Sequence, residues 1–280
     1  MDHFFEGGKA VWENLGDGVS RVIIGHTPEL FTMAVKFKKG GVGTIHTHDV
    51  HNQISYVAAG SFKATIGGVP MYIVLLGQQS GIVGLNAATG KLLWQYKGTP
   101  AAGGVAQIPV PIVKGDHVWV STSYGGGSAL LQIVPKGNEF EVKEVKAYKK
   151  PELNNHHGGM VLVGDYLYFG HDQNQGYPVC VEFKTGEIKW GPEKKAIAGS
   201  QGSAAVIYAD GRLYFRYQNG VMVLIEPSPD ELKVVSSFKL PAADIAKYSQ
   251  SWPHPVIANG KLYIRDQNVM YCYDLKAAGN

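Results

Sequence analysis

The sequence predicts an all-β protein built from two unlike parts, residues 1–69 and residues 70–280. The chain has 36 glycines and 15 tyrosines among 280 residues, and only 18% of its residues are charged. This composition is typical of turn-rich sheets rather than helical bundles. A short strand with a central aromatic residue recurs through the second part, and two histidines share one face of a predicted strand in the first.

Charge and hydropathy exclude several classes of partner. The net charge is only +3 and the lysines are scattered, so no basic patch for nucleic acid is present. The segment Met1–Val11 contains Asp2 and Glu6 and has no apolar run, which is unlike a secretory signal. The longest apolar stretch, Met71–Leu76, is far too short to span a bilayer. We therefore expect neither a nucleic-acid nor a membrane partner, and a cytoplasmic location.

The first part contains half of a metal site. His46 and His48 are two residues apart, so on a strand they project from the same face. Gln53 follows a short turn, on the next predicted strand, and can bring an oxygen atom to the same point. Two imidazoles and an oxygen suit one divalent metal ion of the Ni, Zn, Fe or Mn class.

The full pattern, Gly40-x5-His46-x-His48-x4-Gln53-x6-Gly60, resembles the first cupin motif, with Gln where most cupins have Glu. The flanking segments 12–19 and 55–62 resemble the small KdgF-type cupins of pectin and alginate breakdown. This resemblance covers residues 1–68. It implies a partial cupin β-barrel, metal ligands at His46, His48 and Gln53, and metal-dependent conversion of unsaturated uronates to linear ketonized sugars.

The chain departs from the cupin pattern after this motif. The family's second motif supplies a fourth ligand histidine some 30 residues later, but the next histidine after His51 is His117. The family's C-terminal carboxylate and aromatic residue are also absent, so no catalytic residue is assigned. Three interpretations stay open for this part: a remnant without metal, a metal-binding segment without catalysis, and a working enzyme.

The second part is a repeat of about 48 residues, the period expected of one supersecondary unit. A tight turn containing glycine precedes four of its five aromatic strands, and a short apolar strand precedes each turn. Strand, glycine turn, strand is the pattern of a β-hairpin. The central aromatic residues, at intervals of 47, 49, 46 and 49, are Tyr72, Trp119, Tyr168, Tyr214 and Tyr263.

A second element recurs in phase with the first. Gly90 precedes Trp94, and Gly186 precedes Trp190, in two matching segments whose tryptophans are 96 residues apart. We expect each Thr-Gly pair to form the turn between the third and fourth strands of a unit. Each tryptophan would then lie on the outer strand and pack on the neighbouring unit.

Four short strands per 40–50 residues form the blade of a β-propeller. The tryptophan element resembles the docking motif of PQQ-type propeller repeats, including non-catalytic BamB-like scaffolds, over residues 70–280. PQQ-dependent dehydrogenases of this fold use a vicinal cysteine pair and calcium-binding acidic residues, which this chain lacks, so no PQQ is expected. The segments near 108–154, 155–200 and 201–250 predict three whole blades between two partial ones, and hence an incomplete propeller.

Polar residues cluster near the predicted blade starts. The segments 154–159 and 171–174 together contain three histidines and four asparagine or aspartate residues, and Trp252 and His254 flank Pro253 in a loop. These residues could line a central channel and bind a metal or a sugar. Ordinary turn and channel-lining positions are the commoner explanation for such residues.

These observations favour a non-catalytic β-propeller that binds or scaffolds a protein or carbohydrate ligand and carries a cupin half-site for a divalent metal. The first alternative is a metal-dependent cupin acting on unsaturated uronates. The second is a chimeric fragment, natural, engineered or an artefact of the gene model, without an evolved function. Open β edges also predict self-association, and the BamB-like relatives are often periplasmic.

Overall fold

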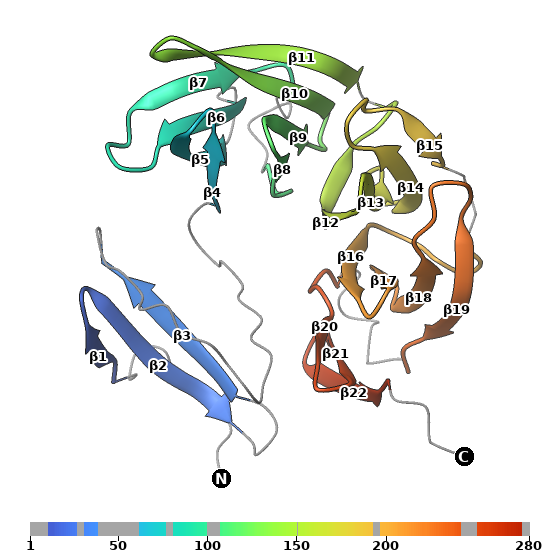
Figure 1. Cartoon of the computed structure of the whole chain (residues 1–280). Coiled ribbons are helices and arrows are strands. Elements are labelled where there is room, and N and C mark those ends of the chain that lie inside the picture. Colours follow the sequence, from blue (N-terminus) through green and yellow to red (C-terminus); the bar gives the residue numbers. More distant parts are fainter. Residues whose placement is uncertain are drawn as a thin grey trace. The chain divides into compact units, whose positions relative to one another are not determined.

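The computed structural model describes residues 11–26, 31–38, 62–76, 81–99, 107–149, 151–192, 197–241 and 251–275. These residues form β-strands and turns, which arrange into six antiparallel sheets in chain order (Figure 1). The chain divides into two compact units. One comprises Met1–Tyr56, Ile257–Lys261 and Asp274–Asn280, and the other comprises Val57–Val256 and Leu262–Tyr273.

The first sheet is a three-stranded meander. Asp17 and Gly18 connect its first two strands with φ angles of 46° and 76°, the doubly positive geometry of a two-residue hairpin turn that matches strand twist. Its first two strands are also joined by an exposed ion pair between Arg21 and Glu13. The strands are β1 (Glu13–Gly16), β2 (Val19–His26) and β3 (Phe31–Phe37).

The second sheet begins before the boundary that the sequence suggested. Gly67 and Gly68 have φ angles of 57° and 76° and join the first two strands so that Ile66 lies opposite Val69. Because glycine reaches positive φ without steric cost, this pair favours a tight hairpin. The strands are β4 (Phe62–Ile66), β5 (Val69–Leu76), β6 (Gly81–Asn86) and β7 (Leu92–Tyr96).

The next three sheets each contain four strands in meander order. Their first hairpins turn at residues 115–116, 164–165 and 210–211, which confirms the predicted glycine turns. The third sheet is β8 (Ile112–Lys114), β9 (His117–Ser121), β10 (Gly127–Lys136) and β11 (Glu139–Lys149). The fourth is β12 (Asn155–Val163), β13 (Tyr166–His171), β14 (Tyr177–Glu182) and β15 (Ile188–Trp190).

The fifth sheet is β16 (Ala204–Ala209), β17 (Arg212–Tyr217), β18 (Val221–Glu226) and β19 (Lys233–Lys239). The sixth has three strands, β20 (Val256–Ala258), β21 (Lys261–Asp266) and β22 (Val269–Asp274). Six consecutive meander sheets are the number found in a six-bladed β-propeller.

The expected partial cupin barrel followed by three whole and two partial blades is therefore wrong, although the all-β class is correct. Among the described residues four sheets have four strands each, because Phe62–Ile66 pairs with β5 and supplies the opening strand thought to be missing. Strand pairing uses backbone groups, so a segment that resembles one family in sequence can complete the sheet of another architecture. The described residues before it form a meander sheet.

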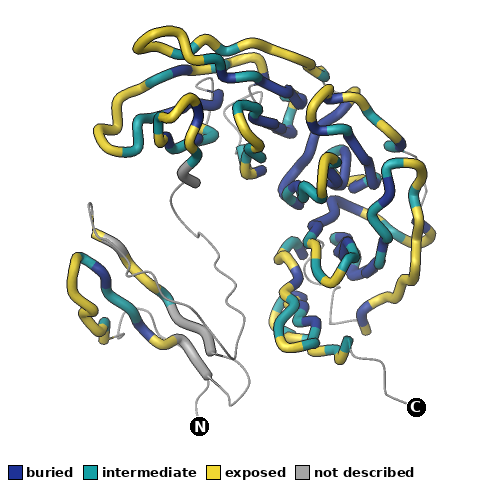
Figure 2. Tube along the Cα trace, in the orientation of Figure 1, coloured by how far each residue is buried: buried dark blue, intermediate teal, exposed yellow. Residues whose placement is uncertain are grey.

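Alternate residues along β9, a strand of the third sheet, point to the two neighbouring sheets, because successive side chains of a strand lie on opposite faces. Val118 and Val120 pack with Met71 of the sheet before, whereas Trp119 between them packs with Phe169 of the sheet after. Both faces of β9 in the third sheet are therefore buried, and Figure 2 shows buried segments in the third to fifth sheets.

Candidate functional site

The predicted metal ligands cannot be located in the structure. His46, His48 and Gln53 lie outside the described residues, within the gap between residues 38 and 62. Among the residues that are described, no three histidine, cysteine, aspartate or glutamate side chains gather closely enough to hold a metal ion.

The repeat tryptophans lie at the joints between neighbouring sheets. Trp94 packs with Val118 and Leu131 of the following sheet, and its indole N–H contacts the Met71 sulfur at 3.3 Å. Trp190 packs with residues of the fifth sheet, and its Nε1 donates to the Ser228 carbonyl at 2.7 Å.

The two repeat glycines occupy matching turns. Gly90 and Gly186, with φ angles of 72° and 74°, each donate their N–H to the carbonyl four residues earlier at 2.8 Å. A positive φ is the reason that glycine suits this position. The two tryptophans and the two glycines are therefore structural elements of the repeat.

A second set of polar residues is buried at one end of the third to sixth sheets. The strand register places the start of β12 beside the end of β13, with Asn155 opposite His171, and the start of β16 beside the end of β17, with Ala204 opposite Tyr217. Neighbouring sheets meet here through side chains rather than through strand pairing. We call the following residues the polar cluster: Tyr124, Asn154, Asn155, His156, His157, Ser203, Arg216, Ser251, Trp252 and Asp266.

His156 links three sheets within the polar cluster. Its Nε2 lies 2.6 Å from the Tyr124 hydroxyl and its Nδ1 lies 2.7 Å from the Ser203 hydroxyl. Burial lowers the pKa of His156 below its ordinary value, so the neutral ring donates through one nitrogen and accepts through the other. Tyr124 has a φ of 53°, which is strained for a bulky residue and requires support from its surroundings.

His157 is the most strongly perturbed histidine of the polar cluster. Burial, followed by the neighbouring His156 and His254, lowers its pKa to about 3. Its ring packs on Trp252 with centroids 4.7 Å apart, and the Trp252 ring also lies 5.4 Å from the His156 ring. Trp252 donates from Nε1 to Gln218 at 2.8 Å. The imidazoles of His156 and His157 are therefore neutral near pH 7 and lie against one indole.

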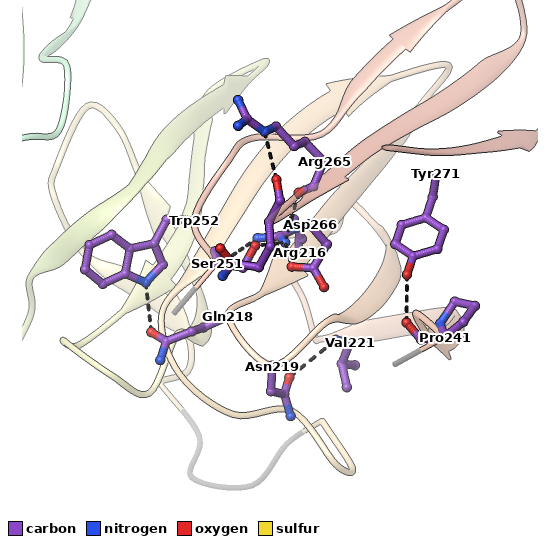
Figure 3. Close-up of polar contacts among 11 residues, drawn as sticks. Arg216, Gln218, Asn219, Val221, Pro241, Ser251, Trp252, Arg265, Asp266 and Tyr271 are labelled. Atoms are coloured by element: carbon purple, nitrogen blue, oxygen red, sulfur yellow. Dashed lines mark hydrogen bonds and ion pairs between the residues drawn. The ribbon is translucent and has the colours of Figure 1, made fainter. Parts of the chain in front are cut away.

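Arg216 forms a buried ion pair with Asp266. The two side chains are 1% and 2% exposed and their charged atoms lie 2.9 Å apart. Arg216 also donates to the Ser251 carbonyl, and through Nη2 to the Ser251 hydroxyl at 2.6 Å (Figure 3). Burial lowers the pKa of Arg216, and the Asp266 carboxylate opposes that shift. A buried charge is tolerated only when it is paired and hydrogen-bonded in this way.

Four polar atoms of the cluster are buried with no hydrogen-bond partner in the part of the chain that the structure describes. Native proteins leave few such groups, and each one indicates a bound water, a ligand or strain. They are Asn154 Nδ2, Asn155 Oδ1, His157 Nε2 and Arg216 Nε.

The sequence indicated part of this cluster and missed the rest. The segments 154–159 and 171–174 and the loop around Trp252 were singled out as polar. Arg216 and Asp266 were missed, because they end hairpin strands 50 residues apart and nothing in the sequence pairs them. One sequence feature could have indicated Arg216. It lies two residues after the central aromatic Tyr214, and the two preceding repeats have the small residues Ser121 and Gly170 at that position.

Comparison with known proteins finds a different relative for each region. A profile of the family described as outer membrane protein assembly factor BamB matches residues 62–192. The pectin degradation protein KdgF of Dickeya dadantii (strain 3937) is 40% identical over 93 residues, which are 31% of this chain and 84% of KdgF. Both resemblances noted in the sequence are thus confirmed.

Solved structures align with this chain at low identity. BamB from Moraxella catarrhalis aligns at 14% identity with a TM-score of 0.48, over 88% of this chain and 63% of its own length. Sqt1 from Saccharomyces cerevisiae aligns at 10% identity with a TM-score of 0.52, over 93% of this chain and 78% of its own. The chain thus spans less than two thirds of the BamB structure. Nowhere in the described ranges is there a helix that could cross a membrane.

Proposed function

We propose that the propeller of this chain is a non-catalytic binding scaffold. Over 31% of its length the chain belongs to the family of the pectin degradation protein KdgF. The observation that carries this proposal is the polar cluster, whose titratable groups hold sheets together. His156 uses both ring nitrogens to join Tyr124 to Ser203, and Arg216 is paired with Asp266. Groups engaged in this way position the loops around a ligand rather than transfer protons.

The resemblance of residues 62–192 to the BamB family supports the scaffold role, since that family is named for an assembly factor. We place the ligand at the end of the sheets where the polar cluster lies. Trp252 there is half-buried, and Pro253 and His254 beside it are exposed, so a ligand can reach the loop.

The KdgF-like segment, in the same proposal, holds one divalent metal ion through His46, His48 and Gln53. Imidazole nitrogens and an amide oxygen are donors that suit Ni, Zn, Fe or Mn. Such a metal would supply a Lewis acid in a site with open positions. The 40% identity to KdgF supports this ligand set.

The test is the metal content of the purified full chain beside a His46→Ala/His48→Ala double variant. The proposal expects close to one equivalent of metal in the parent chain, its loss in the double variant, and unchanged stability of the propeller. Equal metal content in both proteins would reject the assignment of these ligands.

A metal-dependent uronate-processing enzyme is the second candidate. It is favoured by one observation, namely that the match spans 84% of a protein named for pectin degradation. In that case the metal would polarise sugar oxygens for proton transfer. Incubation of the metal-loaded chain with unsaturated uronate separates the two candidates. Loss of the substrate's ultraviolet absorbance in the parent chain, but not in the double variant, would establish the enzyme and reject the purely non-catalytic role.

A further inference from the structure

We propose that the polar cluster binds a neutral sugar ring, whose hydroxyl groups complete the hydrogen bonds of the buried groups that lack partners while the ring packs on Trp252. This inference names the ligand class for the binding role proposed above and rests on it.

The atoms without partners are a mixture of donors and acceptors. Asn154 Nδ2 and Arg216 Nε are donors, Asn155 Oδ1 is an acceptor, and His157 Nε2 takes either role according to its tautomer. Their side chains are between 1% and 8% exposed, and a buried polar group without a partner has lost the hydrogen bonds that it made with water in the unfolded chain. A hydroxyl group donates and accepts at once, so adjacent hydroxyls of one sugar match this mixture better than a ligand with acceptors alone.

The charges of the cluster select a neutral ligand. Asp266 already neutralises Arg216 at 2.9 Å, and His156 and His157 are uncharged because burial lowers both pKa values. An anionic ligand would bring its charge close to the Asp266 carboxylate without gaining an unpaired cation. A cationic ligand would meet Arg216 in the same way. Repulsion in a partly desolvated site is several times stronger than in water, so both classes of charged ligand are disfavoured.

Two aromatic side chains of the polar cluster are only half-buried. Trp252 is half-buried, its ring contacts the imidazoles of His156 and His157, and the adjoining Pro253 and His254 are exposed. Tyr124, also half-buried, contacts His156 edge-on at 5.0 Å. Tyr and Trp combine a flat apolar body with a polar tip, a combination that suits the mixed apolar and hydroxyl faces of a sugar ring.

The test is ligand-observed saturation-transfer NMR on the full chain with D-galactose, D-glucose and D-mannose, each at millimolar concentration. D-galacturonate, which differs from galactose by a carboxylate, is the matched charged probe. We expect saturable transfer from at least one neutral sugar and at least tenfold weaker binding of galacturonate. Trp252→Ala should weaken sugar binding at least tenfold, and Trp252→Phe should retain most of it. Trp12→Ala, which removes a tryptophan from the segment before the first sheet, should leave the affinity unchanged.

Three results would overturn the inference. Absence of transfer from all neutral sugars, in a protein whose circular dichroism shows it to be folded, would mean that water satisfies the buried atoms. Equal or tighter binding of galacturonate would reject a neutral ligand. If the His46→Ala/His48→Ala variant loses sugar binding and Trp252→Ala keeps it, the sugar site lies in the KdgF-like segment. That last result leaves the metal proposal standing, so the two proposals fail separately.

Discussion

Neighbouring sheets of the propeller are joined in two different ways, by apolar contacts across their faces and by polar contacts at one end. Trp94 and Trp190 represent the first kind, and each inserts into the core shared with the following sheet. The Arg216–Asp266 pair and the His156 hydrogen bonds represent the second. The tryptophan joint recurs at the second and fourth sheets, whereas the two polar joints use different residues. The repeat therefore encodes the architecture, and the residues that differ encode whatever distinguishes this propeller from others.

The largest effect is expected from Asp266→Ala, which tests the polar joint. Its removal leaves Arg216, 1% exposed, as an uncompensated buried charge, and such changes cost about 3–5 kcal/mol. Replacing both partners, as in Arg216→Met/Asp266→Leu, removes the charge together with its partner and should recover most of the loss. Urea unfolding measures both changes. If Asp266→Ala lowers the free energy of unfolding no more than the double variant does, the pair is not buried in solution.

Gly84→Ala tests the apolar joint at the second sheet. A Cβ atom at this position would lie 2.1 Å from Trp94 Nε1 and 2.3 Å from Cε2, so the indole must move out of its core position. Overpacking of this kind typically costs 1–3 kcal/mol, and we expect about 3 kcal/mol here because the obstacle is a rigid ring. The same substitution in a Trp94→Leu background should cost far less. Equal costs in both backgrounds would contradict the contact.

The acid sensitivity of the polar joint is a third test. Burial lowers the pKa values of His156, His157 and His171, so folding favours their neutral forms. Their contribution to the free energy of unfolding is complete above the pKa of histidine in the unfolded chain, about 6.5, and is lost as the pH falls below that value. Because the pKa of His157 in the folded chain is about 3, this residue alone should lower the free energy of unfolding by roughly 2 kcal/mol between pH 7 and pH 5.

Urea unfolding at pH 7, 6 and 5 measures this acid sensitivity. His157→Asn removes the most strongly shifted of these titrating groups and should flatten the profile relative to the parent chain. A parent profile that is flat over this range would contradict the burial of the histidines.

The sequence predicted the apolar joints better than the polar ones for a physical reason. Trp94, Trp190 and the glycine turns recur at a fixed period, so each copy supports the interpretation of the others. Arg216 and Asp266 occur once each, and their pairing depends on the contact between two sheets. The fold prediction failed at Phe62–Ile66, because sequence resemblance assigned this strand to the first part while backbone pairing places it in the second sheet. The ligand set His46, His48 and Gln53 stays a prediction.

The smallest effect is expected at an exposed polar contact between the third and fourth sheets. Lys114 Nζ donates to Asp165 at 2.6 Å and to the Gly164 carbonyl at 2.8 Å, with the two side chains 45% and 75% exposed. Water competes for both charges and salt screens them, so such pairs contribute little to folding. Lys114→Met, which keeps most of the apolar stem, should leave the unfolding midpoint unchanged within error at both low and high salt. The Lys114–Asp165 and Arg216–Asp266 contacts both join neighbouring sheets and have similar lengths, so the contrast isolates burial as the variable. A loss approaching that of Asp266→Ala would mean that the geometry of the contact, rather than its removal from water, determines the strength of a polar joint.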